Sequence, residues 1–261
     1  MKEKVFAVIV LLVATSTWMF AESTDCHNPV AVVPDGRSTY NWSHMDGNSN
    51  YYWSWVGQAG HSYSIELVFD FNNDNSSTAP SISSYNVFNV GDNICSGGST
   101  FEGYFWTGTM SPQLPTPSFR VGALAGASGM YGLRITTGKN GGDFSFRIVD
   151  TTLFNPRWST WSGYDTQWGF YNTSDTDIQG VLSIYTSSGT LLKTVNVIVK
   201  AGQQAFHLSI PQDLNLPRNM GGVATFAWVG PPGALMADAY MLNGNASMVV
   251  QSKFEPRNAQ W

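Results

Sequence analysis

A strict alternation of apolar and polar residues constrains the fold of this chain more than any other feature. At residues 61–71, aromatic and aliphatic side chains occupy every second position, and mostly Ser, Glu and Asp lie between them. Because successive side chains of a β-strand point to opposite faces, a period of two indicates a half-buried strand. Residues 143–149 show the same pattern. A strand is also expected at residues 131–135, and the turn pair Asn140-Gly141 predicts a hairpin between it and residues 143–149.

The second half of the chain repeats this rhythm more regularly. We expect seven strands there, at residues 166–172, 178–186, 191–200, 203–210, 223–229, 235–242 and 247–254. About seven short strands in about 100 residues is the profile of an immunoglobulin-like sandwich. Only 12% of the residues are charged and 26 are Gly, which suits strands and turns better than long exposed helices.

The alternation is interrupted near residues 150–156, where two threonines and Asn155-Pro156 break the pattern. The sequence therefore predicts an all-β protein of two β-sandwich domains in tandem. These domains are residues 22–150 and residues 151–256, the second of them immunoglobulin-like, with a short tail at residues 257–261.

The first 21 residues have the order of a signal peptide. Lys2 and Lys4 precede an apolar run from Val5 to Val13, and smaller, more polar residues follow up to Ala21. The run is shorter than the roughly 20 apolar residues that a membrane helix needs. We therefore expect removal of residues 1–21 and a secreted protein, extracellular or periplasmic, with no membrane insertion.

The charge of the chain excludes two classes of partner. The formal net charge is −5, and the sequence has no cluster of Lys and Arg residues. Binding to nucleic acid or to an anionic membrane surface depends on such clusters. We expect neither partner.

Two cysteines, Cys26 and Cys95, follow the signal peptide. In an oxidising compartment a lone pair of thiols usually forms a disulfide, so we expect a bridge between them. The alternative is a reactive thiol, but no neighbouring residues suggest activation of either sulfur.

Parts of both halves resemble known bacterial modules. YWSWVGQAGHSYSI at residues 52–65, together with YGLR at 131–134 and FSFR at 144–147, resembles the pre-peptidase C-terminal domain. WSTWSGYDTQW at residues 158–168, with GPPGA at 230–234 and ADAY at 237–240, resembles modules of secreted bacterial proteins with unassigned role. The first resemblance implies a noncatalytic β-sandwich, and the second implies no catalytic residues.

The sequence contains no complete catalytic motif. The serine-hydrolase pattern Gly-x-Ser-x-Gly is absent, and so are His-Glu-x-x-His and Cys-x-x-Cys. We expect His61 and His207 on the polar faces of strands, where a solvated histidine is the usual case. We therefore expect a protein that is not an enzyme.

One segment has the spacing of calcium ligands. Asp70, Asn72 and Asp74 would place oxygen atoms at the first three ligand positions of an EF-hand loop. However, Asn75 replaces the glycine of the turn, and Ser81 stands in place of the bidentate glutamate. A polar loop after a strand is the alternative, and calcium is the only cofactor that the sequence suggests.

Aromatic residues give the strongest indication of a binding surface. Trp158, Trp161 and Tyr164 lie in a segment that is expected to form a loop before a strand, among small polar residues. Exposed rings beside amides and carboxylates suit carbohydrate binding, because a ring covers the apolar face of a sugar. The alternative is that these rings fill the sandwich cores or seal the domain junction, since large aromatic side chains dominate burial.

These observations leave three hypotheses for function. The first is a noncatalytic secreted protein that mediates extracellular interaction, by binding a polysaccharide or a surface protein. The second is a structural or adhesive component that joins neighbours through exposed sheet edges. The third is a secreted hydrolase of unrecognised type.

Overall fold

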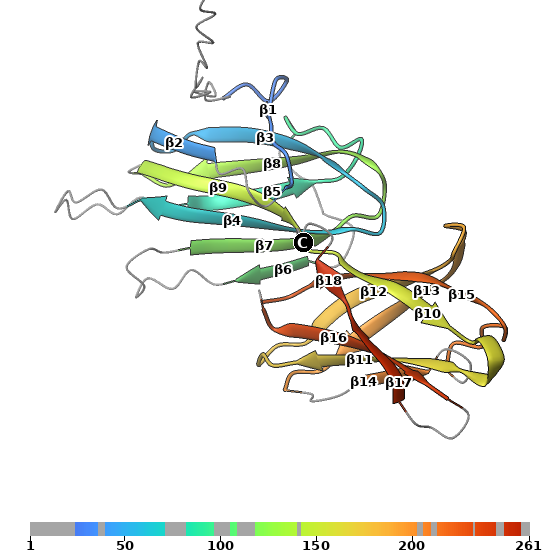
Figure 1. Cartoon of the computed structure of the whole chain (residues 1–261). Helices are drawn as coiled ribbons and strands as arrows, with labels where there is room; N and C mark the ends of the chain where they lie inside the picture. The colour runs from blue at the N-terminus through green and yellow to red at the C-terminus, as the bar shows by residue number, and fades with distance from the viewer. Residues whose placement is uncertain are drawn as a thin grey trace, which may run out of the picture.

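The computed structural model describes residues 24–35, 40–70, 82–96, 105–108, 118–139, 142–202, 206–209, 213–231, 233–243 and 248–256. Within these ranges the chain is all-β, as the sequence predicted. The described strands form four sheets, and the only helical element among the described residues is a three-residue 3-10 turn at Trp161–Gly163. Figure 1 shows two pairs of sheets, one from the blue-to-green N-terminal half and one from the yellow-to-red C-terminal half.

The N-terminal half forms sheets A and B. Sheet A has the strand order β1-β3-β8-β5, and sheet B has the order β2-β9-β4-β7-β6. Neighbouring strands are antiparallel except β1 and β3, which are parallel. The strands are β1 (Val30–Ala31), β2 (Tyr40–Met45), β3 (Asn50–Gly57), β4 (Ser62–Asp70), β5 (Ile82–Phe88), β6 (Phe105–Gly108), β7 (Ser118–Leu124), β8 (Gly129–Thr137) and β9 (Gly142–Asp150).

The core of this half lies between its two sheets. The rings of Trp53, from sheet A, and Phe146, from sheet B, have centroids 5.1 Å apart. Alternate residues of each strand supply the rest of the core, which is why the sequence has a period of two. The principal buried side chains are Tyr51, Trp53, Trp55, Leu133 and Ile135 from sheet A, and Tyr63, Ile65, Phe146 and Ile148 from sheet B.

The C-terminal half forms sheets C and D, both antiparallel. Sheet C has the order β13-β12-β15-β10-β18, and sheet D has the order β14-β11-β16-β17. The strands are β10 (Leu153–Ser159), β11 (Asp165–Asn172), β12 (Ile178–Thr186), β13 (Leu191–Val199), β14 (Phe206–Ser209), β15 (Gly221–Val229), β16 (Leu235–Leu242), β17 (Met248–Lys253) and β18 (Glu255–Pro256).

A second aromatic core lies between sheets C and D. Phe170 of β11 packs on Phe226 of β15 with ring centroids 4.6 Å apart, and Phe254 lies 5.6 Å from Phe170. Trp158, Trp168, Leu182 and Ile184 complete its centre. Each half therefore consists of two sheets around its own core, an arrangement consistent with β-sandwiches.

The disulfide between Cys26 and Cys95 is confirmed, with Cα atoms 5.1 Å apart. It ties the segment before β1 to the loop that follows β5. That loop lies on the outer face of sheet A, where a Cβ atom at Gly132 would be 2.7 Å from Ile94 Cδ1. Arg134 also holds the loop, because its guanidinium donates a hydrogen bond of 3.1 Å to the Ser96 carbonyl.

The predicted hairpin between residues 131–135 and 143–149 is wrong. β8 pairs with β3 and β5 in sheet A, whereas β9 pairs with β2 and β4 in sheet B. β8 and β9 therefore belong to different sheets and do not form a hairpin with each other. An Asn-Gly pair favours a tight turn, but the partner of each strand is decided by which face must be buried.

Removing the disulfide should destabilise the N-terminal half strongly. The two cysteines are 69 residues apart in sequence, and the chain-entropy model assigns a loop of this length about 4 kcal/mol. Cys95→Ser in combination with Cys26→Ser should lower the free energy of unfolding by about 2 to 4 kcal/mol in urea titration. Wild-type protein treated with reductant serves as the comparison, and an unchanged midpoint in both would contradict a stabilising bridge.

Candidate functional site

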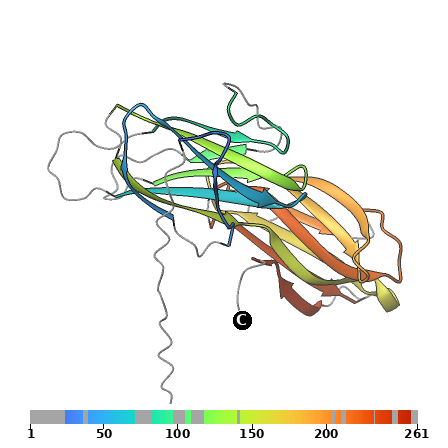
Figure 2. The ribbon, with the colours of Figure 1, turned by 90° about the horizontal axis from the view of Figure 1, so that it is seen from above.

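The two halves of the molecule meet on the outer face of sheet C. There Ala227 and Val229 of β15, together with Val181 of β12, pack against Leu124 at the end of β7. Val181 lies opposite Ala227 in the strand register, so these side chains form one apolar strip across both strands. In Figure 2 the green strands of the N-terminal half end beside the orange strands of the C-terminal half. The N-terminal half therefore covers only one end of this face.

A pocket of 580 Å³ lies beside the covered strip. Its floor includes two successive rows of side chains on the outer face of sheet C. The first row runs from Glu255 through Phe154 to Thr225, on strands β18, β10 and β15. The second row pairs Val223 with Tyr185. All five side chains are half-buried, so they remain open to a ligand of the pocket's size.

His61 forms the wall of the pocket on the side of the N-terminal half. A tight turn places it at the start of β4: its amide donates to the Gln58 carbonyl, and Gly60 adopts a φ of 74°, which glycine tolerates best. His61 Nδ1 lies 2.8 Å from Asp150 Oδ2, and the two side chains are only 12% and 13% exposed. The expectation of a solvated histidine on a polar face was wrong, because the His61 ring lies on the same side as the Tyr63 ring, with centroids 6.5 Å apart.

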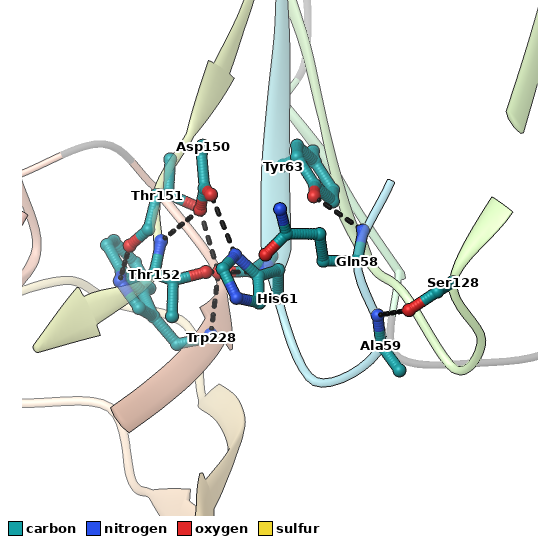
Figure 3. A network of polar contacts seen from close by, with 10 residues as sticks. Gln58, Ala59, His61, Tyr63, Ser128, Asp150, Thr151, Thr152 and Trp228 are labelled. Carbon is teal, nitrogen blue, oxygen red and sulfur yellow. Dashed lines mark hydrogen bonds and ion pairs between the residues drawn. The ribbon is translucent and has the colours of Figure 1, made fainter. Parts of the chain in front are cut away.

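Hydrogen bonds extend from this pair across the junction (Figure 3). The Thr152 amide donates to Asp150 Oδ1 at 3.0 Å, and the Thr152 hydroxyl oxygen accepts from the Ser62 amide at 3.0 Å. The Ser62 hydroxyl oxygen in turn accepts from the backbone amide of Trp228 in β15 at 3.0 Å. The indole of Trp228 donates to the Thr151 carbonyl at 3.1 Å. The wall of the pocket is thus bonded to its floor strand.

Asp150 is held in its charged form. Burial raises the pKa of its carboxyl group, but hydrogen bonds with the His61 side chain and with the hydroxyl and amide of Thr152 lower it. The net result is a pKa below the usual 3.8. The carboxylate fixes the orientation of the imidazole. However, among the described residues that line the pocket none is Ser or Cys, so the pair has no such nucleophile beside it.

The three aromatic residues of the predicted site differ in exposure. Trp158 is 1% exposed, so the expectation that its ring faces solvent was wrong. It belongs to β10, and its indole donates to the carbonyls of Tyr185 and Val223 at 3.0 and 3.2 Å. The segment up to Ser159 is thus a strand and not a loop, and the bulge between Asn155 and Trp158 turns Trp158 into the core.

Trp161 and Tyr164 lie at the following turn. Trp161 is 55% exposed, Tyr164 is half-buried, and the Tyr164 amide donates to the Trp161 carbonyl at 2.9 Å. The Trp161 ring lies beside Gly221, where a Cβ atom would be 3.7 Å from the indole. Gly221 begins β15, so Trp161 lies at the end of this strand that is farther from the N-terminal half.

The predicted calcium ligands lie largely outside the described residues. Asp70 ends β4, but its side chain is not among those described, and neither are Asn72 and Asp74. Elsewhere in the described ranges, one group of side chains is close enough together to hold a metal ion. It consists of Cys26, His27 and Cys95. Its two sulfur atoms are already joined in the disulfide.

Sequence reasoning missed most of the pocket. Phe154 and Glu255 were not considered, because the break at Asn155-Pro156 was interpreted as a domain boundary only. The apolar run VATFAWV at residues 223–229 carried a usable signal. Such a lack of alternation is typical of a strand that is buried on both faces.

The described part of the chain contains no helix that is long and apolar enough to cross a membrane.

Trp158 and Trp161 should differ sharply in their effect on stability. Trp158→Ala removes a buried ring and two hydrogen bonds, and should lower the free energy of unfolding by about 3 to 5 kcal/mol. Trp161→Ala should cost less than about 1 kcal/mol, because most of the ring is already in water. Urea titration of both variants measures the difference, and equal losses would contradict these assignments.

The Asp150–His61 contact should make stability depend on acidity. The folded-state pKa of Asp150 lies below the ordinary 3.8, so its stabilisation is complete above that value and is lost as the pH falls through the folded-state pKa. Asp150→Asn should lower the free energy of unfolding at neutral pH by about 1 to 2 kcal/mol, and the difference from wild type should shrink below about pH 4. Asp175→Asn, at an exposed loop position, is the control and should show neither effect.

In comparisons with known proteins, no protein-family model, no curated protein and no solved structure matches this chain significantly.

Proposed function

We propose that the protein is a secreted, noncatalytic carbohydrate-binding protein whose ligand occupies the pocket between its two halves. The observation that carries this proposal is the composition of the pocket floor. Phe154 and Tyr185 present half-buried rings on the same face as Thr225 and Glu255. A sugar has apolar C–H faces and a rim of hydroxyl groups, and this floor offers partners for both.

The size and position of the pocket support the same proposal. Its volume of 580 Å³ falls within the range of about 300 to 1,000 Å³ that is usual for small-ligand sites, which often lie between domains. Trp161 lies at the open end of the same strand, β15, so a longer saccharide chain could reach its exposed ring. The wall at His61 closes the opposite end.

The residues that line the pocket fit carbohydrate binding better than glycoside hydrolysis. Glycoside hydrolysis generally requires two carboxyl groups on opposite sides of the scissile bond. Glu255 is the one carboxylate among the described lining residues, and Asp150 is engaged by His61 and Thr152. We therefore propose that the protein is not an enzyme.

We extend the proposal to the architecture. The N-terminal half, residues 22–150, would be a sandwich similar to the pre-peptidase C-terminal domain, and residues 151–256 an immunoglobulin-like sandwich. Support comes from the described strands, because those of sheets A and B all precede those of sheets C and D in the chain. An extracellular or periplasmic location is supported by the disulfide, since such bridges persist in oxidising compartments.

The proposal is tested by replacing the pocket tyrosine. Tyr185→Ala should weaken binding of a small oligosaccharide, identified by screening glycan arrays with wild-type protein, by about 1 to 3 kcal/mol. Tyr171→Ala is the matched control, because Tyr171 is also half-buried but lies on sheet D, bonded to Tyr240. Calorimetric titration gives both affinities.

Two results would overturn the proposal. Equal affinities for the two variants would place the binding surface elsewhere. Absence of any saccharide binding by the wild type, with self-association at rising concentration, would instead support the structural or adhesive hypothesis.

A further inference from the structure

The charged groups of the pocket give it a negative character. No Lys or Arg is found among its described lining residues, which include His61 and Glu255. His61 Nδ1 faces the Asp150 carboxylate at 2.8 Å, so these two side chains already contact each other. Glu255 is half-buried, and its side chain makes no hydrogen bond or ion pair with another described residue. One carboxylate of the pocket is therefore uncompensated.

The position of Glu255 makes this carboxylate useful to a ligand. Glu255 lies directly opposite Phe154 in the antiparallel pairing of β18 with β10. Directly opposed residues of neighbouring strands have Cβ atoms about 4.5 to 5.5 Å apart and point to the same side of the sheet. A carboxylate and an aromatic ring at this separation both attract a cation, the first by its charge and the second by the negative face of its π system.

We infer that the ligand of this pocket is an amino sugar, whose protonated amino group binds between Glu255 and Phe154 while its ring lies toward Tyr185. This inference rests on the proposed function and adds the class of sugar. An acidic sugar is disfavoured, because its carboxylate would meet Glu255 without a lining Lys or Arg to neutralise it. A neutral sugar would leave Glu255 without an ionic partner.

Calorimetric titration with two matched probes tests the inference. The probes are a glucosamine tetramer and an N-acetylglucosamine tetramer, in the same mildly acidic buffer in which the free amine is protonated. Wild-type protein should bind the glucosamine tetramer about tenfold more tightly, which corresponds to about 1.4 kcal/mol. Acetylation removes the charge, so the difference reports the cation site.

Two variants locate the effect. Glu255→Gln keeps the shape and removes the charge, and it should abolish most of the tenfold preference while leaving binding of the acetylated tetramer nearly unchanged. Asp175→Asn removes one negative charge from an exposed loop of the same half and should keep the preference. Loss of preference in both variants would show a general charge effect and would overturn the cation site.

The remaining outcomes separate this inference from the function on which it rests. If both tetramers bind equally and Glu255→Gln changes neither affinity, the amino-sugar inference fails while carbohydrate binding stands. If neither these probes nor any other saccharide binds to the folded wild-type protein, both fail.

Discussion

The double burial of strand β15 determines how the rest of the structure is arranged. From Phe226 to Val229 every residue is buried. Phe226 and Trp228 belong to the core between sheets C and D, whereas Ala227 and Val229 lie against Leu124 of the N-terminal half. Burial of apolar surface contributes about 25 cal/mol per Å², so these contacts help to hold the two halves together. Because β15 extends beyond Leu124, its uncovered end becomes the floor of the pocket.

The polar groups at the junction specify the arrangement of the two halves, which the apolar strip alone does not determine. Apolar contact is non-directional, whereas the hydrogen bond from the Trp228 amide to Ser62 and the contact between His61 and Asp150 specify one arrangement. These groups are largely shielded from water, so leaving one without its partner would carry a desolvation cost. The same groups place His61 at the edge of the pocket, so the attachment of the halves and the shape of the site have a common origin.

Much of the strand content could be predicted from the sequence, because it follows from local patterns. The strands at Ile178–Thr186 and Leu235–Leu242 have the predicted limits, since alternation and turn residues mark both ends. The sheet assignment of β8 and β9 could not be predicted, because an Asn-Gly turn does not tell which face each flanking strand buries. The pocket could not be predicted either. Phe154 and Glu255 are 101 residues apart and become neighbours only through the pairing of β10 with β18.

The connection between β9 and β10 has a consequence for how the pocket meets a ligand. It consists of Thr151 and Thr152 alone, and both are held by hydrogen bonds: the Thr151 amide donates to the Ser62 carbonyl, and the Thr152 amide donates to Asp150. A two-residue connection that is bonded in this way leaves no slack for a hinge. For the proposed ligand the site would therefore be preorganised, and binding would avoid the entropic cost of closing two lobes. Selectivity for that ligand would then come from the fixed shape and charge of the cavity.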